Sequence, residues 1–443
     1  MENQKADRED LEAWLESELR VAVARMLESI SATSLVRQRP AFGQSIRPQP
    51  GSVVASPEFG DYNPEPDYFF HWLRDSALVM DALRVLIGAG KMGAEGHAAF
   101  ADFVRFSLSL SAIDATHATS DPGAVDPVFR QYLRPVEELR AVTGDKLLAE
   151  TRFNPDGSLD ILKWARPQLD GPALRALTLM RYWPLRRAGN IEGEAALERL
   201  IRQDLAFVRA HYLEPSFDIW EETLGRHYYT RVVHLGALIQ GEAWLRALGA
   251  NAEANECDAA ANALHPLLDE HWSATQGLYR TRADRIETVP DHDPDIAVIL
   301  GVLHAGLREG THSIADPNVE ATLSRLEEHF ARSFEINKHL PAGARPALGR
   351  YPSDCYFGGG AFYLGTLAAA EFYFRLAEAA QHGASEFSAR ADEFLATVRR
   401  FTPPSGELSE QFDRATGAQT SARNLAWSYA AFITAVFARR ASR

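Results

Sequence analysis

Two kinds of helical pattern alternate along this chain, and that alternation constrains its fold more than any other feature. The segment 424–438 carries no charged residue in fifteen positions, which is typical of a helix buried on every side. The segment 315–334 places six charges among apolar positions at helical spacing, as a half-exposed helix does. A fold with an inner and an outer layer of helices accounts for both patterns.

Helical patterning predicts twelve helices, and we find no convincing alternating strand. Odd helices look half-exposed and even helices look buried, so six outer–inner pairs favour an all-α (α/α)6 barrel, a six-hairpin toroid. A superhelical stack of helix pairs is the competing architecture. Asp170 is expected to cap the fourth helix and Ser421 the twelfth. The approximate ranges are 8–33, 71–90, 94–113, 171–188, 191–212, 226–248, 251–272, 292–308, 315–336, 358–381, 386–401 and 421–440.

Composition excludes several classes of protein. The chain has 46 basic and 60 acidic residues, a net charge of −14, which argues against nucleic acid and anionic membranes as partners. No apolar run reaches the ~18–20 residues that a membrane span needs, and two distant cysteines form no disulfide framework. The start "MENQKADRED" lacks a signal-peptide pattern, so we expect a cytoplasmic protein, or a secreted or periplasmic one if a leader was removed. Nothing indicates the oligomeric state.

Long irregular segments precede each buried helix, at 34–70, 114–170, 213–225, 273–291, 337–357 and 402–420. In a toroid these loops would gather at one end, where function usually lies. The first ends "PDYFFHWLRDSALVM", with Arg74 and Asp75 beside Tyr68 and Trp72. A first-turn aspartate that satisfies the helix terminus, with a local Arg74 pair, is an equal alternative there.

The second and third loops combine tryptophans with charged residues. "LKWARPQLDGPALRAL" holds Trp164 and Arg166, and "SFDIWEETLGRHYYT" holds Glu221 and Glu222 behind Trp220. Desolvation beside indole rings raises the pKa of a carboxylic acid, and a general acid must keep its proton near neutral pH. An ordinary acidic loop is the alternative, and of two adjacent carboxylates only one can face a given point.

The remaining loops supply further polar groups. "TVPDHDPDIAV" is better explained as a solvated acidic turn that caps the eighth helix than as a cation site. The fifth loop holds Arg350, and its glycine run lacks the context of a phosphate loop. Glu410 stands just ahead of the last, charge-free helix. No cysteine or histidine cluster recurs, so we expect no metal and no cofactor.

Aromatic faces combined with Arg and Asp side chains suit a sugar, because ring faces stack and hydroxyls need hydrogen-bonding partners. Two carboxylates across such a pocket are the usual requirement for glycoside hydrolysis. Five ordered motifs then resemble glycoside hydrolase family 15, the glucoamylase type, over roughly residues 50–440. They are "YFFHWLRDSALV", "WARPQLDGPALRA", "DIWEET", "GRYPSDCY" and "SEQFDRATGAQTSARNLAWSYA".

The resemblance implies an (α/α)6 barrel and a role for each motif. It implies that Glu221 is the general acid and Glu410 the general base of an inverting enzyme, with ~6.5–9.5 Å between the carboxyl groups. The substrate-binding positions that it implies are Tyr68, Trp72, Arg74, Asp75, Trp164, Arg166, Trp220, Glu222 and Arg350.

The sequence also departs from the family pattern. Gly360, Ala361 and Phe362 replace a common Asn-Pro-Trp, so we expect a softer loop there, and Phe70 and Asn424 replace a common tyrosine and aspartate. We expect a single catalytic domain over 1–443, with 1–50 as helix and lead-in and no separate starch-binding or β-sandwich domain.

The resulting hypothesis is an exo-acting hydrolase that releases β-D-glucose from the non-reducing ends of α-glucans or α-glucosyl oligosaccharides. The preferred linkage, α-1,4, α-1,6 or that of trehalose, stays open. The alternative is a non-catalytic glucan-binding regulatory protein, which would need neither Glu221 nor Glu410.

Overall fold

The computed structural model is dominated by helices and describes residues 2–61, 65–117, 125–186, 191–284, 292–341, 343–380 and 382–443. Each predicted long helix is present, with boundaries shifted by a few residues. They are α1 (Glu2–Glu28), α2 (Leu73–Gly88), α3 (Ala94–Leu110), α6 (Asp170–Tyr182), α7 (Ile191–His211), α8 (Tyr228–Ala247), α9 (Asn251–Asp269), α10 (Ala297–Ala305), α11 (Pro317–Ser333), α13 (Tyr363–Ala379), α14 (Ala384–Phe401) and α15 (Ala426–Ala441). The short helices α4 (Val136–Arg140), α5 (Asp145–Leu148) and α12 (Glu335–Lys338) had no clear sequence signal.

The alternation of burial is confirmed helix by helix. In α2, α6, α8, α10, α13 and α15 most residues are buried, whereas α3, α7, α9, α11 and α14 expose one face. No residue from 424 to 440 is exposed. The charge-free segment 424–438 therefore reflects burial, because a charged group there would lose its hydration.

Short antiparallel strands, which were not predicted, pair with one another and stabilise the long loops. Two or three residues are too few for alternation to be recognised in sequence, so these strands were missed. The pairs are β1 (Arg37–Arg39) with β2 (Gln44–Ile46), β3 (His71–Trp72) with β4 (Arg152–Phe153), β5 (Ser216–Phe217) with β6 (Leu224–Gly225), and β7 (Trp272–Ser273) with β8 (Leu278–Tyr279). The strands β9 (Ala361–Phe362), β10 (Gln411–Phe412) and β11 (Gln419–Thr420) form one sheet with β10 in the middle.

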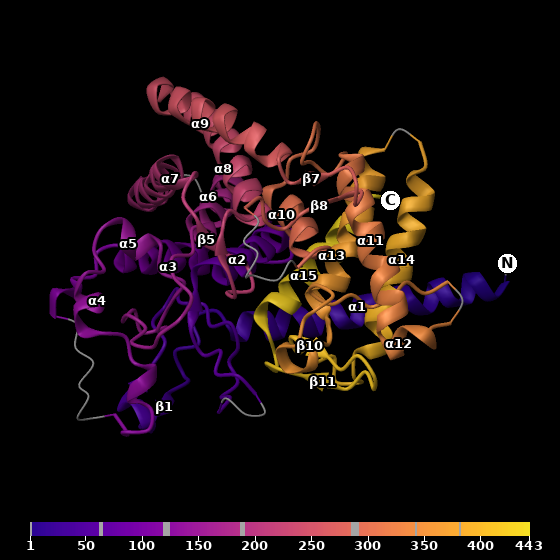
Figure 1. The fold of residues 1–443 in the computed structure, drawn as a ribbon, viewed down its shortest axis with the longest axis horizontal. Helices are drawn as coiled ribbons and strands as arrows, with labels where there is room; N and C mark the ends of the chain where they lie inside the picture. Colours follow the sequence, from indigo (N-terminus) through magenta and orange to yellow (C-terminus); the bar gives the residue numbers. More distant parts are fainter. Residues whose placement is uncertain are drawn as a thin grey trace. The chain divides into compact units, whose positions relative to one another are not determined.

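The chain forms two compact units. The first unit comprises residues 1–27, 60–66 and 266–443, and the second comprises 28–59 and 67–265. In the second unit α6 packs against α2, α7 and α8, and in the first α13 packs against α14 and α15 (Figure 1). Gly171 permits the approach of α6 to α2, since a Cβ there would lie 2.6 Å from the Cβ of Leu73.

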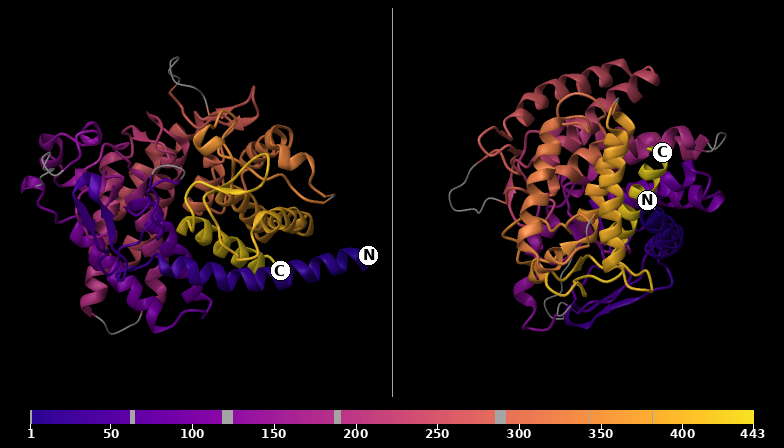
Figure 2. Two further views of the ribbon diagram at one scale, coloured as in Figure 1. Left: turned by 90° about the horizontal axis from the view of Figure 1, so that it is seen from below. Right: turned by 90° about the vertical axis from the view of Figure 1, so that its right-hand side faces the viewer.

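Within the first unit the amino-terminal helix lies along the carboxy-terminal one (Figure 2). The Trp14 and Phe432 rings meet edge to face at 5.6 Å, and Arg439 pairs with Glu12 and Asp392 at 2.6 Å each. These contacts fix α1 against α15. Among the residues that the structure describes, no helix combines the length and the apolar character needed to cross a membrane.

Both predicted helix caps are wrong. Asp170 is the first residue of α6, whose cap position is Leu169, and its side chain makes no cap hydrogen bond. Ser421 precedes the start of α15 by five residues, and its hydroxyl donates to Glu410 instead. The sequence pattern predicted roughly where both helices start. The side chains of Asp170 and Ser421, however, contact other polar groups instead of capping the helices.

Candidate active site

Glu221 lies at the tip of the β5–β6 hairpin, in the loop 218–223. The buried Asp218 side chain organises this loop by accepting hydrogen bonds from the backbone N–H groups of Trp220 at 2.7 Å and Thr223 at 2.6 Å. Glu221 has a φ of 67°, and a left-handed backbone costs a residue with a side chain ~1–2 kcal/mol. Such strain persists where the surroundings hold it, and it is common at functional sites.

Side chains from two other segments of the second unit, 72–74 and 164–168, hold the Glu221 carboxylate. Its Oε1 accepts from Trp72 Nε1 at 2.8 Å, Arg74 Nη2 at 3.1 Å and Gln168 Nε2 at 3.3 Å. Its Oε2 accepts from Trp164 Nε1. A carboxyl group beside indoles was predicted, but the indoles come from Trp72 and Trp164 rather than from the adjacent Trp220.

Arg74 is the centre of a buried charge cluster in the second unit. Its guanidinium lies 3.3 Å from Asp75 Oδ2, 3.6 Å from Asp170 Oδ2 and 3.1 Å from Glu221 Oε1. Burial raises the pKa of Asp75 to about 6 and also raises the pKa of Asp170, although Arg74 opposes both shifts. Asp75 and Asp170 thus retain a proton more readily than isolated carboxyl groups, because burial penalises their charged forms.

This cluster favours the functional interpretation of the first motif. Asp75 does lie in the first turn of α2, but Arg74 pairs with residues far away in the sequence as well as with its neighbour. An aspartate that only satisfies the helix terminus, with Arg74 paired to it locally, would need no partners from distant segments. Asp170 makes no hydrogen bond among the described residues with either carboxylate oxygen, so its burial fits a ligand-binding cluster.

Tyr68 and Trp164, two of the aromatic residues predicted to form a wall, lie around Trp72. Its ring meets Tyr68 at 5.3 Å and Trp164 at 6.3 Å, both edge to face. The buried Arg152 guanidinium lies 3.6 Å from the Trp164 ring and 4.0 Å from the Phe70 ring. Trp164 is 40% exposed, so a cation stacked on one ring face fixes an indole that remains accessible to a ligand.

Arg166 takes part in an ionic network beneath this wall. Its Nε lies 2.6 Å from Glu150 Oε2, and its Nη2 lies 3.1 Å from Asp160 Oδ2. Asp160 also pairs with Arg152 at 2.8 Å. Arg166 therefore helps to orient Arg152, and its direct contact with a substrate stays a prediction, as it does for the half-buried Trp220 and the exposed Glu222.

In the first unit the backbone of Glu410 is fixed on both sides. Its N–H donates to the carbonyl of Ala422 at 2.8 Å, and its carbonyl accepts from the N–H of Tyr363 at 3.3 Å. The Ser421 hydroxyl donates to Glu410 Oε2. Glu410, which directly precedes β10, is thus held by the first residue of α13 and by the loop after β11.

The loop before Glu410 is anchored on α15, as the sequence predicted. The Ser428 hydroxyl donates to the carbonyl of Ser409 at 2.9 Å. The N–H of Leu408 donates to the Tyr429 hydroxyl at 2.9 Å, and this hydroxyl donates to Asn424 Oδ1 at 2.6 Å. A buried, rigid helix thereby positions a carboxylate that must act from a loop.

Arg350 is buried in the first unit and forms a double ion pair with Asp354, through Nε at 2.8 Å and through Nη2. The rings of Tyr351, Tyr356 and Phe362 surround its guanidinium at 5.1–5.6 Å. The predicted softening at residues 360–362 is wrong for the backbone, because Ala361 and Phe362 form β9 and pair with β10.

The acidic fourth loop is a structural turn, but not a solvated one. Asp295 is fully buried and accepts from the N–H of Ala297 at 2.8 Å, at the start of α10. Asp293 accepts from the N–H of Thr281 at 2.7 Å. Asp291 lies outside the described residues.

Sequence comparison decides the family. The family model described as "Glycosyl hydrolases family 15" matches residues 39–386 and 377–437. The chain belongs to glycosyl hydrolase family 15. It is therefore a glycosidase, and the matched segments include Glu221, Glu410 and the predicted substrate-binding positions.

Relatives within family 15 extend over most of the chain. A glucoamylase from Blastobotrys adeninivorans is 28% identical over 452 residues, which cover 89% of this chain and 68% of the relative. A probable glucoamylase from Schizosaccharomyces pombe is 26% identical over 483 residues, which cover 99% and 94%. The solved family 15 glucoamylase from Hypocrea jecorina matches with a TM-score of 0.78 at 24% identity, covering 97% of this chain and 72% of that chain. This likeness confirms the all-α (α/α)6 fold class.

Sequence analysis missed three residues that contact the predicted site residues. Arg152, Gln168 and Ser421 contact the aromatic wall, Glu221 and Glu410 respectively. Gln168 and Ser421 lie within quoted motifs, so their position was a usable signal. Arg152 lies in an unremarkable stretch, and only the β3–β4 pairing brings it to Trp72.

Proposed function

We propose that the chain is an inverting, exo-acting glycosidase that releases β-D-glucose from the non-reducing ends of α-glucans or α-glucosyl oligosaccharides. Glu221 is the general acid and Glu410 the general base. The observation that carries this proposal is the family 15 match across both carboxylates, each on a fastened loop.

The proposed reaction needs two carboxyl groups in opposite protonation states. Glu221 gives a proton to the glycosidic oxygen, while Glu410 takes a proton from the water that attacks the anomeric carbon from the opposite face. An inverting enzyme keeps the two groups ~6.5–9.5 Å apart so that the water fits between them. A single catalytic domain over residues 1–443 is part of this proposal.

The surroundings of each carboxylate support its role. Arg74 holds the Glu221 carboxyl group in place through its ion pair at 3.1 Å, and burial raises the pKa of the neighbouring Asp75 to about 6. The Ser421 hydroxyl donates to Oε2 of Glu410, and this hydrogen bond orients the carboxylate for its role as base. Asp75, Arg74 and Arg350 are charged groups suited to the hydroxyls of the terminal sugar.

The experiment that tests the activity is glucose release from maltose, isomaltose, trehalose, dextran and soluble starch. The proposal predicts that glucose alone is formed and that Glu221→Gln abolishes its release from every substrate. Release of longer oligosaccharides would contradict exo action. Binding of starch without turnover would support a glucan-binding protein instead. The cytoplasmic location also stays a prediction, which fractionation of cells that express the native gene would check.

A further inference from the structure

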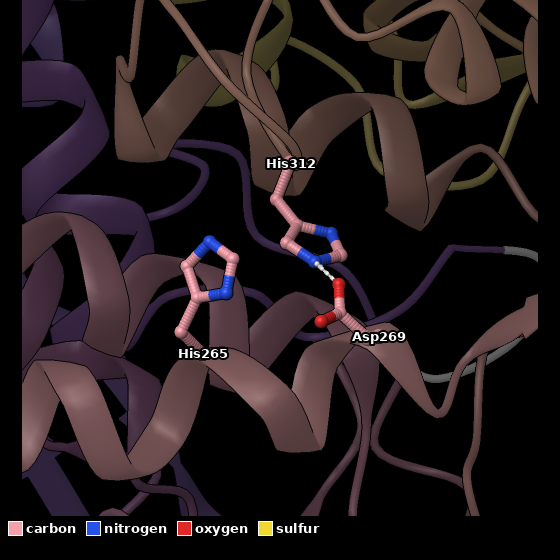
Figure 3. Close-up of side chains that lie close together, drawn as sticks. All are labelled: His265, Asp269 and His312. Atoms are coloured by element: carbon pink, nitrogen blue, oxygen red, sulfur yellow. Dashed lines mark hydrogen bonds and ion pairs between the residues drawn. The ribbon is translucent and has the colours of Figure 1, made fainter.

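Two histidines and an aspartate converge where α9 ends (Figure 3). His265 and Asp269 lie four residues apart on α9, and therefore on one face of the helix. His312 lies in the loop between α10 and α11. One ligand atom from each residue lies within 4.8 Å of the others, and His312 Nε2 is 3.0 Å from Asp269 Oδ1.

His312 is held in place before any ligand arrives. Its ring is fully buried and packs 5.1 Å from the Tyr279 ring. Its backbone has a φ of 61°, and its N–H donates to Asp316 Oδ2 at 2.8 Å. Asp316 in turn caps α11 through the N–H of Asn318. A buried imidazole fixed at a strained position is the kind of preorganisation that a binding site uses.

We propose that His265, Asp269 and His312 form a binding site for a divalent transition-metal ion such as Zn²⁺. Two imidazole nitrogens and one carboxylate oxygen are ligands that zinc commonly takes in proteins, with a fourth position open to water. Asp269 is 57% exposed in its side chain, so solvent reaches the site and can supply the fourth ligand.

The distances allow closure around an ion. Tetrahedral ligands ~2.0–2.1 Å from zinc lie ~3.4 Å from one another. The pair formed by His312 and Asp269 already meets this spacing. His265 is half-buried and Asp269 is exposed, so small side-chain rotations bring the third ligand in while the buried His312 stays fixed.

The bound ion would cross-link the last turn of α9 to the loop before α11. A ligand that binds the folded state alone raises the stability of that state. None of the three residues belongs to the motifs assigned to glycoside chemistry. The site therefore acts on stability and not on the reacting groups.

The experiment uses the untagged chain, stripped with a chelator and dialysed, with zinc chloride as the probe. Titration calorimetry is expected to show one equivalent of zinc bound, and scanning calorimetry a higher Tm with zinc than without. His265→Ala and Asp269→Asn are each expected to weaken binding at least about tenfold, because even outer partners of metal ligands are worth ~10–100-fold. Both replaced side chains are at least partly exposed, so the variants should fold.

His339→Ala is the matched control, because His339 is exposed and lies 3.3 Å from Glu335, four residues away. This variant should bind zinc like the parent chain. Absence of binding at millimolar zinc would overturn the proposal. Equal affinity of the parent chain and both site variants would also overturn it, since the ion would then lie elsewhere.

Discussion

The two carboxylates assigned to the reaction are held by different kinds of contact. Glu221 in the second unit is fixed through its side chain, which accepts hydrogen bonds from Trp72, Trp164, Arg74 and Gln168. Glu410 in the first unit is fixed at its backbone, which bonds to Tyr363 at the start of α13 and to Ala422 in the loop after β11. Its side chain accepts from the Ser421 hydroxyl.

This difference matches the two chemical roles. A general acid must present its proton to the glycosidic oxygen, so side chains that hold its carboxyl group from several sides suit it. A general base must hold a water molecule beside the anomeric carbon, so a firmly held backbone suits it. The comparison teaches that side-chain contacts orient the acid, while backbone contacts and α15 place the base.

The largest effect is expected from removing either carboxylate. Glu221→Gln and Glu410→Gln should each lower kcat on maltose by ~10²–10⁴ with little change in substrate binding. The two variants should differ on α-glucosyl fluoride, whose leaving group needs no proton. Glu221→Gln should recover activity there, and Glu410→Gln should not.

Steady-state kinetics on both substrates measures this difference. Glu407→Gln serves as the control, because Glu407 lies in the same loop and pairs with Arg25 near the surface. Equal recovery of both site variants on the fluoride would show that the acid and base are wrongly assigned. Near-normal turnover of Glu221→Gln on maltose would remove Glu221 from the reaction.

Charged residues from both units should contribute to binding of the terminal sugar. Asp75→Ala and Arg350→Ala should each raise KM or lower kcat/KM by ~10–10²-fold, as loss of a charge-assisted hydrogen bond does. Kinetics with maltose and with a competitive sugar inhibitor measures both effects. Unchanged kinetic values in both variants would show that neither residue binds the sugar. Weaker binding in one variant alone would show that only this residue contributes.

A buried carboxyl beside the loop of the base should make stability depend on pH. Glu18 on α1 lies against Gly406, where a Cβ would be 2.7 Å from its Oε2, and burial raises the pKa of Glu18 to about 7. The folded state therefore binds this proton more tightly than the unfolded chain, and stability falls as the pH rises from about 4.5 to about 7.

Glu18→Gln should remove this dependence and stabilise the protein by about 1–3 kcal/mol at pH 8, since one pKa unit corresponds to ~1.4 kcal/mol. At pH 4 the variant and the parent should be similarly stable. Urea denaturation at both pH values measures the effect. The same fall in stability between pH 4 and pH 8 in both proteins would contradict the role of Glu18.

The smallest effect is expected from Ser421, whose hydroxyl donates to the base. Ser421→Ala should lower kcat about 3–10-fold and leave KM unchanged, because one hydrogen bond is worth ~0.5–1.5 kcal/mol. Ser405→Ala, an exposed serine of the same loop, should change neither value. A larger rise in KM than fall in kcat for Ser421→Ala would mean that Ser421 binds the sugar instead.

Sequence patterning predicted the helices because buried positions recur along a helix and are filled by apolar residues. The charge-free stretch 424–438 and the mixed stretch 315–334 differ in composition because one is buried and the other exposes a face. The short strands are too short to show a recurring apolar pattern. Their pairings bring together residues that are distant in sequence. Arg152 reaches Trp72 through β3 and β4 in this way.

The roles of individual polar residues were harder to predict than their positions. Asp170 and Ser421 both have residue types that cap helices, yet each serves a charged cluster or a carboxylate. The His265, Asp269 and His312 cluster joins residues 47 positions apart. Proximity of this kind depends on tertiary packing, which residue type and spacing do not encode.

The most direct test of the account is the anomeric form of the first glucose released, followed by proton NMR within the first minutes of hydrolysis of maltose or another α-linked substrate. If one carboxyl protonates the leaving oxygen while another activates water on the far side of the ring, the fresh product is β-glucose, which then equilibrates slowly. α-Glucose as the first product would contradict the account.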